Sequence, residues 1–343
     1  MIEIDGAEGG GQILRIATAL SVLSGRPLRV TNIRGARPKP GLQPQHLLGV
    51  KALGELSQAR VQGAEIGSTT VTFEPGSIRG RPDWRLEVGT AGSTMLLVQS
   101  LLPCLAAAGD RSRVTLTGGT NNPWAPPVEY FQEVFLPTVE RMGVRARLEL
   151  RRRGFYPKGG GEVVLEVDPC PEVKPIQRTE RGDLTGIRGV AYSRNLPRHI
   201  TERIAKAVTE RLQAAGLPRP QFEYDTEGPS ASPGCGVVLF ADCAGDVRLG
   251  GDALGERGKP AEKVGEEAAE ALIHEIESGA AVDRHLADQL VIYAALASGQ
   301  SRYLASEATD HIRLAIDVTQ RMLDARFALE GERPVAVACA GRR

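Results

Sequence analysis

The stretch Ser306-Glu307-Ala308-Thr309-Asp310-His311, which runs into Ile312-Arg313-Leu314-Ala315-Ile316, has the pattern of a helix start. Apolar residues then recur at helical spacing, and Thr309 or Asp310 is a suitable N-cap. His311 therefore falls in the first turn, where free N–H groups and the positive end of the helix dipole disfavour imidazolium. A neutral imidazole there can act as a nucleophile, and a phosphate is favoured beside it. Taken alone, the stretch is better described as a histidine on a solvated helix start.

The order of elements around this helix occurs three times, at about residues 1–75, 83–168 and 283–340. In each copy two helices alternate with strands, and two further strands close the unit. In the third copy the first helix is predicted at residues 284–297. The repetition is one of pattern rather than of residue identity, and it predicts a repeat architecture.

Residues 179–280 interrupt this order. Short strands, an amphipathic helix and a long acidic helix are predicted there, which indicates a small α+β domain inserted between the second and third copies. A separate linked domain is the less favoured alternative, because the third copy resumes after this segment. We therefore predict an α+β fold of three repeated units, each a four-stranded sheet backed by two helices, plus the smaller insert. Residues 1–178 and 281–343 are predicted to form one large catalytic domain.

The composition is that of an ordinary soluble globular protein. The formal net charge is zero and aromatic residues make up 4% of the chain, so any nucleic-acid binding must come from local clusters. The five cysteines are widely spaced and include no pair with zinc-site spacing, which favours reduced thiols. Neither a signal peptide nor a membrane-length apolar run is visible, and a cytoplasmic location is expected.

Three stretches carry candidate chemistry. Glu8-Gly9-Gly10-Gly11-Gln12-Ile13-Leu14-Arg15 opens a helix on glycines, a possible phosphate cradle that lacks the Walker A pattern. The loop Arg34-Gly35-Ala36-Arg37-Pro38-Lys39 carries cations suited to phosphate oxygens. His46 occupies roughly the repeat position of His311 and is a competing nucleophile candidate. Each stretch also has a plain structural interpretation as a turn, an exposed loop or a helix start.

The most unusual string is Arg151-Arg152-Arg153-Gly154-Phe155-Tyr156-Pro157-Lys158-Gly159-Gly160-Gly161. Four cations, two aromatic residues and a glycine triplet favour a loop that faces an anionic polymer. The alternative is a wide hairpin whose glycines only turn the chain. The composition favours the first interpretation.

The part of this string from Arg153 onward resembles the signature of the RNA 3′-terminal phosphate cyclases. Other blocks of that family are resembled, in the same order, by four further stretches of this chain: Gly9-Gly10-Gly11-Gln12-Ile13-Leu14-Arg15, Lys39-Pro40-Gly41-Leu42, Leu286-Ala287-Asp288-Gln289 and His311. The resemblance covers nearly the whole chain. It implies a fold of three sheet-and-helix repeats with an insert, in agreement with the repeats described above.

The resemblance also implies a reaction. His311 would be adenylylated by ATP, AMP would pass to an RNA 3′-phosphate, and the neighbouring 2′-OH would displace AMP to leave a 2′,3′-cyclic phosphate. It implies that Glu8 associates with a divalent cation, Mg²⁺ or Mn²⁺. The RNA phosphate would be bound by Arg15, Arg34 and Arg37. The ATP pocket would be formed by Gln99, Pro127, His285, Leu286, Ala287, Asp288 and Gln289.

Two other functions stay open at this point. One is a noncatalytic RNA-binding assembly factor of the same fold, although such relatives lack the nucleophilic histidine. The other is an enolpyruvyl-transferase-like enzyme, whose fold repeats a similar unit and which forms no histidine adduct.

Overall fold

The computed structural model describes residues 1–341 and contains four sheets of four strands each. In the first unit the sheet order is β1-β2-β4-β3, with β1 and β2 parallel and the other neighbours antiparallel. Its elements in chain order are β1 (Ile2–Asp5), α1 (Gln12–Ser24), β2 (Leu28–Thr31), α2 (Pro44–Leu56), β3 (Arg60–Gln62) and β4 (Val71–Glu74).

The second unit has the same topology, in the order β5-β6-β8-β7. Its second helix contains a π-helical segment, Phe131–Phe135, that ends two residues before Pro137, which has no N–H to continue α-helical bonding. The elements are β5 (Trp84–Glu87), α3 (Thr94–Ala106), β6 (Ser112–Gly118), α4 (Val128–Tyr130), α5 (Leu136–Arg141), β7 (Ala146–Arg152) and β8 (Gly161–Val167).

The third unit repeats the order as β9-β14-β16-β15, but its first strand precedes the insert. The two-residue strand β9 (Gln177–Arg178) pairs in parallel with β14, so the insert lies within the third unit rather than before it, which corrects the predicted start of this copy near residue 283. The remaining elements are α8 (Arg284–Leu296), β14 (Ser301–Ala305), α9 (Asp310–Met322), β15 (Phe327–Glu330) and β16 (Val335–Cys339).

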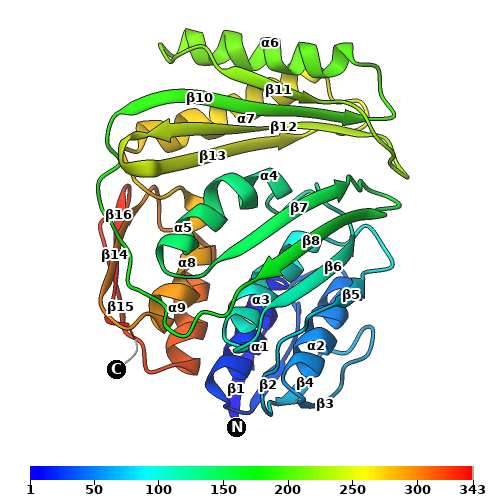
Figure 1. Cartoon of the computed structure of the whole chain (residues 1–343), viewed down its shortest axis with the longest axis vertical. Coiled ribbons are helices and arrows are strands. Elements are labelled where there is room, and N and C mark those ends of the chain that lie inside the picture. Colours follow the sequence, from blue (N-terminus) through cyan, green and yellow to red (C-terminus); the bar gives the residue numbers. More distant parts are fainter. Residues whose placement is uncertain (342–343) are drawn as a thin grey trace.

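The insert forms its own sheet, in the order β11-β10-β12-β13, with two helices on one face. Figure 1 shows it as a separate layer above the three units. Its elements are β10 (Leu184–Arg194), α6 (His199–Ala214), β11 (Gln221–Asp225), β12 (Gly234–Cys243), β13 (Val247–Leu254) and α7 (Ala261–Glu277).

The helices of the three units meet in the middle of the molecule, and their sheets lie outside (Figure 1). Helix α1 packs against α2, α3 and α9, and α8 packs against α9 and α3. One continuous hydrophobic core joins the three units, and a second core fills the insert. The predicted fold class is confirmed; the domain limits at residues 178 and 281 stay a prediction. Among residues 1–341, no helix has both the length and the apolar character needed to cross a membrane.

Candidate active site at the meeting of the three units

His311 lies in the first turn of α9, and Thr309 is the N-cap residue. The Thr309 hydroxyl accepts a hydrogen bond from the Ile312 N–H at 3.3 Å, which fixes the start of the helix. The His311 ring reaches across to α1, where its Nδ1 lies 2.6 Å from Oε1 of Gln12. A side chain of the first unit therefore sets the orientation of this imidazole in the third unit.

The Gln12 amide can be oriented in only one way. Its Nε2 lies 3.0 Å from Oδ2 of Asp288 and 3.1 Å from the carbonyl oxygen of His311, and both atoms are acceptors. The Gln12 oxygen must therefore face His311, and Nδ1 of the imidazole must donate to it. The proton of neutral His311 is then on Nδ1, which leaves the Nε2 lone pair available as a nucleophile.

The surroundings of His311 also favour its neutral form. Desolvation of the ring lowers its pKa, Arg15 lowers it further, Asp310 acts in the opposite direction, and Arg37 lowers it again. Arg15 stays charged near neutral pH: burial lowers its pKa to about 10, against the attraction of Asp288. The site therefore combines a neutral imidazole with nearby cations, which is an arrangement suited to binding phosphate.

His46, the competing candidate, has its lone pair already engaged. Its Nδ1 accepts a hydrogen bond from the backbone N–H of Gln43 at 3.3 Å, so the proton of the neutral ring is on Nε2. Burial, together with Arg15 and Arg34, lowers its pKa to about 3. The ring is 8% exposed. His46 is thus neutral, buried and without a free nucleophilic nitrogen.

The glycine triplet at residues 9–11 allows four segments of the chain to come together beside His311 and His46. A Cβ on Gly10 would lie 3.1 Å from Nε and Nη2 of Arg37, and a Cβ on Gly11 would lie 2.3 Å from Nε2 of His46. A Cβ on Gly9 would meet the Leu314 side chain of α9 at 2.9 Å. The glycines therefore bring α2, α9 and the basic loop against the start of α1.

A cavity lies where α1, α3 and α8 meet. Two buried oxygens on its wall, Gln289 Oε1 and Tyr293 Oη, have no hydrogen-bond partner within residues 1–341, so they are available to a ligand that donates hydrogen bonds. Burial raises the pKa of Asp288 to about 7. The residues that line the cavity are Gln12, Arg15, Ile16, Gln99, Ser100, Phe135, Asp288, Gln289, Ile292 and Tyr293.

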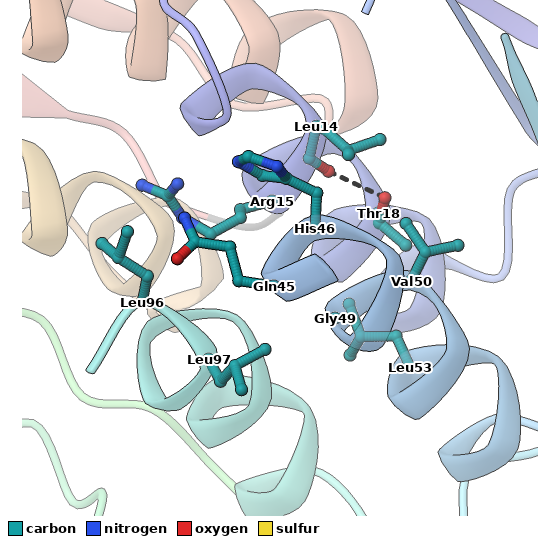
Figure 2. Close-up of a pocket in the computed structure, with 10 residues that line it drawn as sticks. All are labelled: Leu14, Arg15, Thr18, Gln45, His46, Gly49, Val50, Leu53, Leu96 and Leu97. Atoms are coloured by element: carbon teal, nitrogen blue, oxygen red, sulfur yellow. Dashed lines mark hydrogen bonds between the residues drawn. The ribbon is translucent and has the colours of Figure 1, made fainter. Parts of the chain in front are cut away.

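A second cavity lies between α1, α2 and the start of α3, and Arg15 lines both cavities. Figure 2 shows Arg15, Gln45 and His46 gathered on one side of it, opposite apolar side chains such as Leu53. The wall opposite the polar residues is apolar, so the cavity presents charge at one end only.

The two arginines of the basic loop differ in their surroundings. Arg34 donates from Nη1 to the carbonyl oxygens of Lys39 at 2.6 Å and Gly41 at 2.9 Å, so it closes its own loop. Arg37 is exposed, beside Gly10, and makes no ion pair or hydrogen bond from its side chain within the described residues. The Arg37 guanidinium is thus without a partner among the described residues, and the predicted phosphate roles of Arg34 and Arg37 stay predictions.

Glu8 is exposed in the turn before the glycine triplet. No group of three or more His, Cys, Asp or Glu side chains within residues 1–341 is arranged to hold a metal ion. A single carboxylate does suit a Mg²⁺-type ion whose other ligands are substrate phosphates and water. Glu8 fits that kind of site, and its predicted metal role remains a prediction.

The other predicted ATP residues surround the start of α8. His285 is exposed, and its ring meets Tyr130 edge to face at a centroid distance of 6.3 Å. Pro127 is buried at the N-cap of α4, the helix that carries Tyr130. Leu286 and Ala287 are fully buried, so in this structure they anchor the helix and do not line the surface. Their predicted nucleotide contacts stay a prediction.

Arg153, in the string predicted to face an anionic polymer, is in fact buried. It is 2% exposed, and its guanidinium bonds Glu129 at 2.5 Å and Asp225 of the insert at 2.7 Å, above the Tyr192 ring. Arg152 donates to the Gly160 carbonyl. The prediction was therefore wrong for Arg153, because its carboxylate partners come from distant parts of the chain.

Gln12 was not predicted as a site residue, although it stands inside a stretch that was. A signal was present: an amide directly follows the glycines on a helix face that otherwise reads as apolar. Gln45 was also missed, because a polar residue at the start of a helix is ordinarily solvated. Its Oε1 instead accepts from the Ser93 N–H at 2.9 Å, which joins the first two units.

The repeated units and their shared cationic site define a class of protein arranged for phosphate chemistry. The model of the RNA 3′-terminal phosphate cyclase family matches residues 6–329, and the chain belongs to that family. A protein of Thermococcus onnurineus named RNA 3′-terminal phosphate cyclase is 48% identical over 335 residues, covering 97% of this chain and 96% of the relative. Proteins of the same name from Caldivirga maquilingensis and Pyrobaculum aerophilum are 47% and 46% identical, each covering 95% of this chain and 94% of the relative.

These relatives confirm the resemblance read from the sequence, and the chain is an enzyme of this family. A solved structure of the enolpyruvyl transferase NikO from Streptomyces tendae aligns with 51% of this chain and 33% of its own, at 19% identity and a TM-score of 0.29. That similarity is too weak to bear on the fold or the function.

Proposed function

We propose that this chain is an ATP-dependent RNA 3′-terminal phosphate cyclase that works through an adenylylated His311. The observation that supports it best is the Gln12–His311 hydrogen bond, which leaves Nε2 of a neutral imidazole free beside two arginines. The cavity between α1, α3 and α8, with its unpartnered buried oxygens, is the proposed site of the nucleoside. ATP and an RNA end with a 3′-phosphate are the proposed substrates.

The proposed reaction has three displacements at phosphorus. Nε2 of His311 attacks the α-phosphorus of ATP, a P–N bond forms and pyrophosphate leaves. An oxygen of the RNA 3′-phosphate then attacks the same phosphorus and breaks the P–N bond. Finally the neighbouring 2′-OH loses its proton and attacks the RNA phosphorus, and AMP leaves. Forming covalent intermediates in this way replaces one difficult reaction step with several easier steps.

The residues of the site have distinct proposed tasks in this reaction. Gln12 holds the Nδ1 proton while the ring gains positive character on forming the P–N bond. Arg15 stabilises charge on the nucleotide phosphate from its position between the two cavities, and Arg37 binds the RNA phosphate from the surface. Glu8 would hold a divalent cation, Mg²⁺ or Mn²⁺, which when bound neutralises phosphate charge.

Labelling with ATP that carries radioactive phosphorus in the α position tests the proposal. Wild-type protein with a divalent metal should acquire acid-labile label. The His311→Ala variant should acquire none and should not cyclise RNA, whereas His46→Ala should keep the label because its lone pair is already bonded to Gln43. Absence of label on wild type, or its loss only in His46→Ala, would contradict the proposal and favour a binding factor or another nucleophile.

Arg37 offers a test of the second displacement. Arg37→Ala should impair transfer of AMP to 3′-phosphate RNA more than it impairs labelling of the protein, because the exposed guanidinium is available to the incoming phosphate. Single-turnover rates of the two steps measure this difference. An equal loss in both steps would contradict the assignment.

A further inference from the structure

Two aromatic side chains of the second unit stand out at the surface. Trp124, in the loop between β6 and α4, is 97% exposed, and Tyr156, in the β7–β8 hairpin, is 75% exposed. Trp124 also has a φ of +60°, a left-handed conformation that costs free energy in a residue other than glycine. Trp124 buries almost none of its side chain and Tyr156 only a small part, so neither side chain adds much to packing.

The loops that carry these residues are bonded to each other. The Thr120 N–H donates to the Gly154 carbonyl at 2.9 Å, and the Gly154 N–H donates to the Thr120 hydroxyl at 3.0 Å. Arg153 donates to the Asn121 side chain at 3.1 Å. The two loops therefore form one fixed support rather than two independent segments.

Both loops rest on the turn formed by residues 89–93. The Asn122 amide donates to the Ala91 carbonyl, and a Cβ on Gly159 would lie 2.8 Å from the Ala91 Cα. The glycine at position 159 thus permits the hairpin to sit directly on this turn. Trp124 is two residues from Asn122, and Tyr156 is three residues from Gly159.

The same turn contacts the candidate active site. The Ser93 N–H donates to Oε1 of Gln45, and Gln45 lines the cavity shared with Arg15 and His46 (Figure 2). The turn at residues 89–93 therefore connects Gln45, on the wall of the cavity that Arg15 also lines, with the two loops that carry the exposed aromatic side chains.

We infer that Trp124 and Tyr156 form an aromatic platform that stacks the bases upstream of the RNA 3′ end. The inference rests on the proposed function, which places the terminal phosphate beside Arg37. Aromatic side chains bind single-stranded bases by stacking without requiring a given sequence, as an enzyme acting on RNA ends requires. Lys158, exposed in the same hairpin, supplies a cation for the backbone.

Intrinsic fluorescence tests this platform without ATP or turnover. The chain has two tryptophans, and Trp84 is buried at 8% exposure, so Trp124 is the one that a ligand can reach. Adding single-stranded RNA with a 3′-phosphate should quench the emission of wild type and of Trp84→Phe. Quenching that persists in Trp124→Phe, or none in wild type, would overturn the inference. Because ATP is absent, this result is independent of whether the protein becomes adenylylated.

Binding and kinetics give a second measurement. Trp124→Ala and Tyr156→Ala should each weaken RNA binding roughly 5- to 150-fold, the range for loss of one base stack. Labelling of His311 by ATP alone should not change. Cyclisation of a nucleoside 3′-phosphate, which has no upstream base, should also match wild type. An equal defect with this minimal substrate would overturn the platform, whereas failure of labelling in wild type would instead count against the proposed function.

Tyr224 provides the matched control. It is 43% exposed on β11, and its ring meets that of Phe222, which packs on the core of the insert. Alternate residues of a strand share a face, so Tyr224 lies on the helix-covered face of the insert sheet. Tyr224→Ala should leave RNA binding unchanged, and a loss equal to that of Tyr156→Ala would contradict the specific role of the platform.

Discussion

Replacing Gln12 by methionine tests whether the orientation of His311 governs the first displacement. Methionine keeps the length and the apolar stem but removes the acceptor 2.6 Å from Nδ1. As the P–N bond forms, the ring gains positive charge, so this hydrogen bond becomes charge-assisted and contributes about 1.5–3 kcal/mol. We therefore expect Gln12→Met to slow labelling of the protein about 10- to 150-fold.

The measurement is the single-turnover rate of label transfer from ATP at saturating nucleotide. Gln12→Met also leaves the Asp288 carboxylate with one partner fewer, so urea unfolding is measured in parallel to separate stability from rate. Gln132→Met is the matched control, because that amide donates to the Leu148 carbonyl at 2.9 Å in the second unit. A wild-type labelling rate in Gln12→Met would refute the argument that Gln12 sets the tautomer.

Three further predictions concern stability. Gly11→Ala should lower the free energy of unfolding by about 1–3 kcal/mol, because the new Cβ would collide with His46, whereas Gly186→Ala, with nothing within 4 Å, should cost far less; equal urea midpoints would contradict this. Arg153→Met should cost about 3–5 kcal/mol by leaving the buried Glu129 carboxylate without its cationic partner, whereas Asp225 keeps its ion pair with Arg194; calorimetry measures the loss. Burial raises the pKa of Asp252 to about 7, so the folded protein keeps a proton that the unfolded chain loses near pH 4. As the pH rises between those values, this carboxyl lowers the free energy of unfolding by up to about 1.4 kcal/mol per pH unit, and Asp252→Asn should remove that contribution but not the one from Asp288 in urea unfolding at several pH values.

The elements of the fold could be predicted from the sequence because most carry strong local signals. Helix α8 was predicted at residues 284–297 and occupies Arg284–Leu296, since Asp283 suits the N-cap position and apolar residues follow at helical spacing. Strand β9 was missed because it has two residues and its partner in the sheet follows the insert. A strand that short has no periodicity to detect.

Charged residues at the site were harder to assign than the elements that carry them. Arg34 and Arg37 stand on one turn, and the sequence does not tell which of them closes the loop; the carbonyls of Lys39 and Gly41 decide it. Arg153 looked available for RNA because its partner Asp225 lies in the insert. The roles of His311, Glu8 and the predicted ATP residues remain proposals that the labelling experiments address.

The position of β9 has a consequence for synthesis of the chain. This strand leaves the ribosome before the entire insert, and its partner β14 follows only after the insert. The first two units can complete their sheets from segments that are close in sequence. The third sheet cannot form until the strands that follow the insert have been synthesised. Since His311 and Asp288 belong to that third unit, the proposed nucleophile can take its place beside Gln12 only after the insert, α8 and α9 have been synthesised.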